Sequence, residues 1–137
     1  MSMRQYAVAY ALAALVFLVI DAIWLTSMAD RLYRPAIGAL MRERYALAPA
    51  LIFYVIYLAG MLVFAIVPGL KAGSWQTALG YGALLGLLAY ATYDLTNQAT
   101  LRDWPWKVTL ADLCWGTFAT AVASAASCRL TLWITRT

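Results

Sequence analysis

Four long apolar stretches, separated by short charged turns, constrain this chain more than any other feature. They cover residues 6–26, 47–67, 75–98 and 108–133. As a helix, each stretch is long enough to cross the roughly 30 Å hydrocarbon layer of a bilayer. Hydrophobic residues make up 65% of the 137 positions, whereas soluble domains are about 45–50% apolar. The sequence therefore predicts an all-α polytopic membrane protein, a single four-transmembrane-helix bundle over residues 1–137.

The segment after the first stretch carries a weaker signal. Between Asp30 and Tyr45, apolar residues recur on one helical face, and three arginines lie away from it. This pattern predicts either a short amphipathic helix at the membrane interface or a basic loop. Further along the chain, Pro68 and Gly69 are typical of a helix end, so we expect the second span to end there.

The basic residues predict topology and partners. Four spans place both termini on the same side, and the two loops at the other side hold more positive charge. Those loops contain Arg31, Arg34, Arg42, Arg44, Arg102 and Lys107, against Arg4, Lys71, Arg129 and Arg136 on the side of the termini. The positive-inside rule then predicts cytoplasmic loops and periplasmic termini. Basic residues in short membrane loops favour membrane lipids as partners and argue against nucleic acid.

Several kinds of chemistry are absent from the sequence. The chain has no histidine, which removes histidine metal sites and histidine general bases. Cys114 and Cys128 lie in one predicted helix, about 21 Å apart along its axis, too far to form a disulfide. Acidic oxygens could hold a divalent cation, but no spacing here is specific to one. We predict no metal and no cofactor.

Three acids are predicted at one depth in the membrane. Asp21, Asp94 and Asp112 each lie within one or two turns of the same face, because helices one and three end where helix four begins. Each acid costs about 2.5–3.5 kcal/mol at a helix centre and less near the ends. Such residues usually mark a functional pocket. Crowded carboxyls cannot all ionise cheaply, which favours proton handling or a neutral carboxylic donor.

Aromatic and amide side chains accompany these acids. Tyr90, Asp94 and Asn97 share one helix face, and the pattern D-x-x-W occurs twice, from Asp21 and from Asp112. An indole N–H can donate to a carboxylate, and the ring can form a wall for a ligand. We predict no particular catalytic residue. The predicted ligand-binding residues are Asp21, Trp24, Tyr90, Asp94, Asn97, Asp112 and Trp115.

A purely structural interpretation of the acids stays open. Asp21 could lock helix one to helix four, Asp112 could be favoured at a helix N-terminus, and Asp94 could pair with Arg102. Small residues at helical spacing predict close helix packing, either within the chain or in a homo-oligomer. These are Gly82, Gly86, Gly116, Ala119 and Ala123.

Three stretches carry a resemblance to a known family. They are DAIWL in helix one, YDLTNQATLRDWPW after helix three and DLCWG in helix four. With them, nearly the whole chain resembles the bacterial membrane family called domain of unknown function 2177. The resemblance implies a small four-helix integral protein of a bacterial inner membrane, and it highlights the acids and indoles named above. It implies no reaction.

Three functions remain open from the sequence. The first is binding or moving a lipid or small amphiphile in an acidic and aromatic pocket near one membrane face, with proton coupling as an option. The second is a membrane-embedded enzyme that modifies a lipid or isoprenoid by aspartate acid–base chemistry. The third is an assembly partner of another membrane protein. Whether the chain is an enzyme is left undecided.

Overall fold

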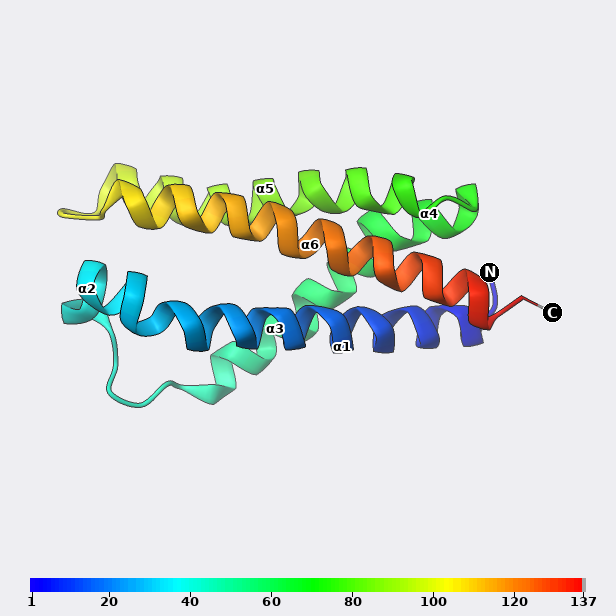
Figure 1. Cartoon of the computed structure of the whole chain (residues 1–137), viewed down its shortest axis with the longest axis horizontal. Coiled ribbons are helices and arrows are strands. Elements are labelled where there is room, and N and C mark those ends of the chain that lie inside the picture. Colours follow the sequence, from blue (N-terminus) through cyan, green and yellow to red (C-terminus); the bar gives the residue numbers. More distant parts are fainter. Residues whose placement is uncertain (137) are drawn as a thin grey trace.

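The computed structural model describes residues 1–136, and within that range the chain is helical and has no strand. The long helices are α1 (Met3–Met28), α3 (Leu47–Met61), α5 (Trp75–Thr100) and α6 (Trp106–Ile134). Figure 1 shows them side by side, with α3 crossing obliquely and both ends of the chain at the same end of the bundle. The predicted all-α bundle is confirmed.

Helix α6 is the centre of the bundle. It contacts both α1 and α5, and Figure 1 shows it between them. Its buried surface consists largely of small residues such as Ala119, Ala123 and Ser124. The Ser127 hydroxyl also donates to the Ala9 carbonyl of α1 at 2.7 Å. Small side chains let neighbouring backbones approach closely, which replaces the hydrophobic driving force that is missing in lipid.

Helix α1 presents one narrow stripe to the bundle. Ser2 and Gln5 form a capping box at its start. Its buried residues are Ala9, Ala13, Phe17 and Asp21, one at every fourth position. Because residues four apart lie on the same helix face, the stripe that packs the core also aims Asp21 inward.

The chain after α1 stays helical but changes its winding. A π-helical turn, η1 (Ala29–Tyr33), leads into α2 (Arg34–Ile37) and the 3₁₀ turn η2 (Gly38–Leu40). Residues 41–46 are irregular. Of the two conformations left open by the sequence, the first part is helix and the last part is loop. Asp30 and Arg34 form an exposed ion pair at 2.9 Å on this segment.

The second apolar stretch does not end at Pro68 and Gly69, and that expectation was wrong. After α3, the helix widens into a π turn, η3 (Leu62–Ile66), and continues as α4 (Val67–Ala72). Proline in a regular helix clashes with the carbonyl four residues earlier. The π turn just before Pro68 changes that register, so the helix passes the proline. Gly73 then ends it with a left-handed backbone, φ 62°.

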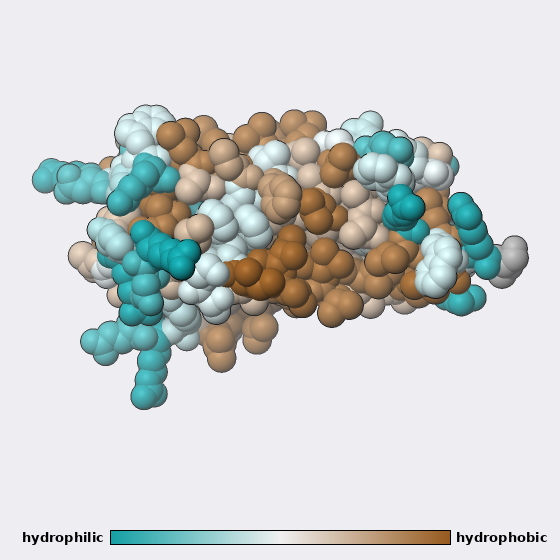
Figure 2. Space-filling view, viewed as in Figure 1, coloured by the Kyte–Doolittle hydropathy of each residue, from teal (hydrophilic) through white to brown (hydrophobic). Residues whose placement is uncertain are grey.

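The outer surface is that of a membrane protein. Three helical segments are long and apolar enough to cross a bilayer: Met3–Leu40, Leu47–Ala72 and Trp106–Ile134. The fourth helix, α5, is 26 residues long but more polar, and it packs along α6. Exposed apolar side chains such as Leu51, Ile52 and Ile56 face outward. Figure 2 shows an apolar band between two hydrophilic ends.

The contact between α5 and α6 is the most extensive in the bundle. A Cβ added at Gly82 would come within 2.8 Å of the Ser124 hydroxyl, and one at Gly86 would overlap the Gly116 carbonyl. All the small residues predicted to pack helices are buried within this one chain. These positions pack helices within one chain. Homo-oligomerisation stays a prediction that the structure of a single chain does not test.

Candidate functional site

A cavity of about 370 Å³ lies between the helices at the end of the bundle opposite the termini. Five segments line it: α1, the π turn η1, α3, α5 and α6. Along α6, Asp112 lies about 9 Å from the start of the helix, so the cavity is inside the apolar zone near one end. Its lining residues are Asp21, Trp24, Leu25, Tyr33, Phe53, Tyr54, Ala89, Tyr90, Tyr93, Asp112 and Trp115.

Asp21 is held from two sides. The Tyr54 hydroxyl of α3 donates to Oδ2 at 2.5 Å, and the Trp115 indole of α6 donates to Oδ1 at 3.1 Å. One carboxyl of α1 thus joins three helices. Hydrogen bonds to a carboxyl are stronger than those between neutral groups, so Asp21 also has the structural role that the sequence left open. Both of its oxygens already accept a bond.

Asp112 is held from one side only. The Tyr33 hydroxyl donates to its Oδ1 at 2.5 Å, and the Trp24 indole donates to the Tyr33 hydroxyl at 2.9 Å. Among the described residues, no hydroxyl, amide or indole donates to Asp112 Oδ2, and the Asp94 carboxyl lies beside Asp112. The Asp112 side chain lines the cavity and is 6% exposed. A carboxyl oxygen without a protein donor can accept a bond from a ligand.

The two D-x-x-W motifs exchange partners across the bundle. The indoles of Trp24 and Trp115 stack with centroids 4.6 Å apart and planes 7° from parallel. The indole of the second motif donates to Asp21 of the first, and Trp24 reaches Asp112 through Tyr33. From the sequence, each indole could hydrogen-bond a carboxyl. In the structure each indole is connected to the carboxyl of the other helix, directly for Trp115 and through the Tyr33 hydroxyl for Trp24.

Asp94 lies behind the cavity rather than in its wall. Its side chain is completely buried, and neither carboxyl oxygen has a hydrogen-bond partner. The Asp112 carboxyl lies beside it, and a bond between the two acids needs a shared proton; the nearby Trp104 indole donates to the Thr109 hydroxyl at 3.1 Å. The alternative ion pair with Arg102 is not formed; among residues 1–136 the ion pair is that of Asp30 and Arg34. An unpaired buried carboxyl is costly, and such groups often mark function.

Of the two remaining predicted residues, Tyr90 lies in the cavity wall and Asn97 does not. Tyr90 lines the cavity, and its ring lies directly over Gly116, where a Cβ would overlap it. Asn97 does not line the cavity. The neighbouring Gln98 has the clearer structural part, because it bonds the Trp104 carbonyl at 2.6 Å and accepts from the Thr109 hydroxyl at 2.7 Å. These bonds fasten the turn between α5 and α6.

Two tyrosines of the cavity wall are not among the predicted ligand-binding residues. Tyr54 lies in the second apolar stretch, where no site residue was predicted, and Tyr33 lies in the segment whose conformation the sequence left open. Yet each is the hydroxyl donor to one cavity carboxyl. One signal for Tyr54 existed, since Tyr54 and Tyr57 are the polar-capable side chains of an otherwise apolar stretch. No signal marked the π turn that places Tyr33.

All the ionisable acidic and basic side chains in the cavity wall are acidic. Two carboxyls line it, and no lysine or arginine does. In the described part of the chain, no three acidic or cysteine side chains are grouped to hold a metal ion. The wall is otherwise aromatic and apolar. Such a cavity suits an apolar or amphiphilic molecule with a polar group that meets the carboxyls.

The fold, the apolar belt and the intramembrane cavity define a polytopic helical membrane protein. Comparison with known families agrees with this class. Residues 6–129 match the family described as "Predicted membrane protein (DUF2177)", and the chain belongs to it. No curated protein and no solved structure matches the chain.

Proposed function

We propose that this protein binds or moves a lipid or small amphiphile in the cavity between α1, α3, α5 and α6. One observation carries the proposal: a cavity of about 370 Å³ inside the apolar zone has aromatic walls and two anchored carboxyls. Ligand cavities generally combine apolar walls with a few polar groups that fix orientation. The polar head would meet the carboxyls, and the apolar tail would extend toward the bilayer.

Proton exchange is part of this proposal. Asp94 accepts no bond from a hydroxyl, amide or indole, and it lies next to Asp112, which lines the cavity. The titratable groups around Asp112 are Asp94, Tyr90 and Tyr93 on α5, Asp21 on α1 and Tyr33 on η1. Two neighbouring buried carboxyls share protons more readily than they carry two charges. Binding of a ligand at Asp112 would therefore be coupled to uptake or release of a proton by this pair.

The test is to identify what purifies with the protein. The chain is extracted in a mild nonionic detergent, and the molecules bound to it are identified by native mass spectrometry. We expect an amphiphile in stoichiometric amount with the wild type and much less with Asp112→Asn and Trp115→Ala. Asp30→Asn removes an exposed acid at the same end and is the matched control. Equal retention of bulk membrane lipids by all four proteins would overturn the proposal.

An enzyme is the alternative function, and one observation favours it. The two cavity carboxyls differ, since Asp21 accepts bonds on both oxygens and Asp112 on one. Carboxyls in unequal surroundings can divide the roles of acid and base. If the protein modifies a lipid or isoprenoid, deletion of the gene removes a modified lipid and Asp112→Asn fails to restore it. An unchanged lipid profile in the deletion strain would exclude this alternative.

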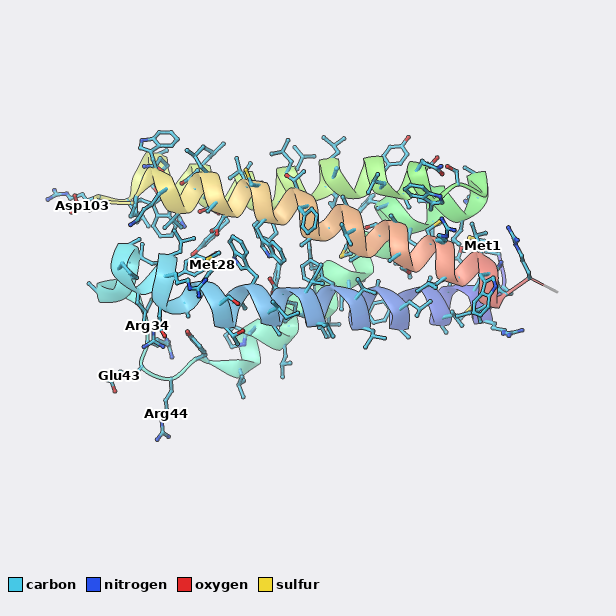
Figure 3. All side chains as sticks on the ribbon, viewed as in Figure 1. Met1, Met28, Arg34, Glu43, Arg44 and Asp103 are labelled. Atoms are coloured by element: carbon cyan, nitrogen blue, oxygen red, sulfur yellow. The ribbon has the colours of Figure 1, made fainter. Side chains whose placement is uncertain are left out.

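We further propose that the protein lies in a bacterial inner membrane with its cavity near the cytoplasmic face. The end of the bundle with the cavity holds the more basic loops, and Figure 3 shows Arg34 and Arg44 there, opposite Met1. Basic loops remain in the cytoplasm. A C-terminal alkaline phosphatase fusion should be active and a green fluorescent protein fusion dark, since the termini would be periplasmic. The reverse result would invert this orientation.

A further inference from the structure

We propose that the cavity selects amphiphiles with a positively charged ammonium head over anionic and neutral ones. The inference deepens the proposed function and depends on it. It follows from the charge and ring composition of the cavity wall, together with the unused oxygen of Asp112.

The first argument is electrostatic. Asp21 and Asp112 line the cavity, and no basic side chain does. Arg34 lines an adjacent pocket, not this one, and is paired with Asp30 at 2.9 Å. An anionic head inside the inner cavity would meet carboxyls without a compensating cation. In a wall of low dielectric such a head is strongly disfavoured.

The second argument comes from the aromatic rings. Seven of them line the cavity, and cations within about 6 Å of a ring face are attracted by its quadrupole. Trp24 and Trp115 stack on each other, so each keeps one face for other contacts. The rings are those of Trp24, Tyr33, Phe53, Tyr54, Tyr90, Tyr93 and Trp115. Rings beside carboxyls form the usual site for an ammonium group.

The third argument identifies the anchoring oxygen. Asp21 accepts one hydrogen bond on each oxygen, whereas Asp112 accepts one from Tyr33 on Oδ1, and no hydroxyl, amide or indole of the described residues donates to its Oδ2. Tyr33 and Trp24 hold the Asp112 carboxyl in position through a chain of two bonds. The ammonium head would therefore contact Asp112 Oδ2, while Asp21 contributes charge from a fixed position.

The test uses three probes that share one undecyl chain brominated on a carbon close to the head and differ in the head: trimethylammonium, hydroxyl and sulfate. Bromine quenches indole fluorescence on contact, so saturable quenching reports occupancy near Trp24 and Trp115. The protein carries Trp106→Phe and Trp133→Phe, because these two indoles are 61% and 71% exposed and would report the micelle. The micelle is dodecyl maltoside, which has no charge.

We expect the ammonium probe to bind about tenfold or more tightly than the alcohol, and the sulfate most weakly. Surface charge cannot produce this order, because the chain has a net charge of +4 and would attract sulfate. Asp112→Asn should remove most of the ammonium preference and leave binding of the alcohol nearly unchanged. Asp30→Asn, which removes an exposed acid of the same end, should change neither.

Two failures are distinguishable. If the alcohol or sulfate probe quenches saturably and as tightly as the ammonium probe, the cavity binds amphiphiles without this selectivity, and the inference is wrong. If none of the three probes quenches saturably, the proposed function itself is contradicted. Retention of the ammonium preference in both Asp112→Asn and Asp21→Asn would also overturn the inference, even if binding is tight.

Discussion

The α5–α6 pair is built differently in its two halves. Toward the termini, Gly82 lies so close to α6 that a Cβ would come within 2.8 Å of the Ser124 hydroxyl. Toward the other end, the ring of Tyr90 lies over Gly116, and beyond it acids and indoles line a cavity of about 370 Å³. Small residues close the first half of the bundle, and large rings surround a cavity in the second.

The difference shows how one small bundle accommodates polar groups in lipid. The closed half supplies backbone contact over a long interface, which is the main source of helix association in a membrane. The open half contains an unpaired carboxyl, Asp94, which lowers stability more than the unpaired hydroxyls of Ser124 and Thr131 in the closed half. Proteins tolerate such groups where function needs them and where the rest of the fold compensates.

The largest expected effect comes from disturbing the closed half. Gly86→Ala places a methyl group against the Gly116 backbone carbonyl, which cannot rotate away, so α5 and α6 must separate. We expect a loss of about 3 kcal/mol in the free energy of unfolding, measured by steric trapping in micelles. Gly80→Ala is the control, since nothing lies within 4 Å of its added Cβ. Equal stability of the two variants would show that the halves do not differ in this way.

The second effect concerns the anchor of Asp21. Tyr54→Phe removes a hydroxyl that donates to Asp21 Oδ2 at 2.5 Å. We expect a loss of about 1–2 kcal/mol in the free energy of unfolding, because a bond to a carboxyl inside lipid has no water to replace it. Tyr10→Phe removes a more exposed bond to the Val55 carbonyl and should cost less. If Tyr10→Phe lowers the free energy of unfolding as much as Tyr54→Phe does, the bond to Asp21 stabilises the fold no more than an exposed bond does.

The third effect has the opposite sign. Asp94→Val removes a carboxyl that is completely buried and has no partner for either oxygen. We expect the free energy of unfolding to rise by about 1 kcal/mol, while the proposed coupling of ligand binding to pH is lost. Both are read from unfolding in micelles and from probe binding across pH. A variant that is less stable and binds normally would show that Asp94 serves the fold and not the site.

The smallest effect on global stability is expected at the edge of the cavity. Tyr33→Phe breaks the bond that ties η1 to Asp112. Because η1 and α2 lie at the periphery, their release is local and should change the free energy of unfolding by less than about 1 kcal/mol. Amide hydrogen exchange over residues 29–46 should nevertheless become faster, with little change in α6. Unchanged exchange would show that packing, and not this bond, holds the segment.

Much of the fold could be predicted because it depends on patterns that every membrane helix must obey. Four apolar stretches and short turns define the bundle, and the four-residue repeat from Ala9 to Asp21 sets the inward face of α1. The π turns could not be predicted in this way. They change register by a single residue, and the sequence around Pro68 was therefore interpreted as a helix end.

The site was predictable in its acids and indoles but not in its connections. Depth along each helix placed Asp21 and Asp112 together, and both line the cavity. Depth alone does not give rotation about the helix axis, so it could not separate the lining residue Asp112 from Asp94 behind it. The hydroxyl donors came from an apolar helix and from a π turn, where single residues carry no periodic signal.

The most direct test of the account is an experimental structure with the brominated ammonium probe bound. The account predicts density in the cavity, with the ammonium group beside Asp112 and the chain between the rings of Trp24 and Tyr90. Asp21 should keep its bonds to Tyr54 and Trp115. Probe density only on the lipid-facing surface, or Asp21 and Asp112 directed away from a shared cavity, would contradict the central claim.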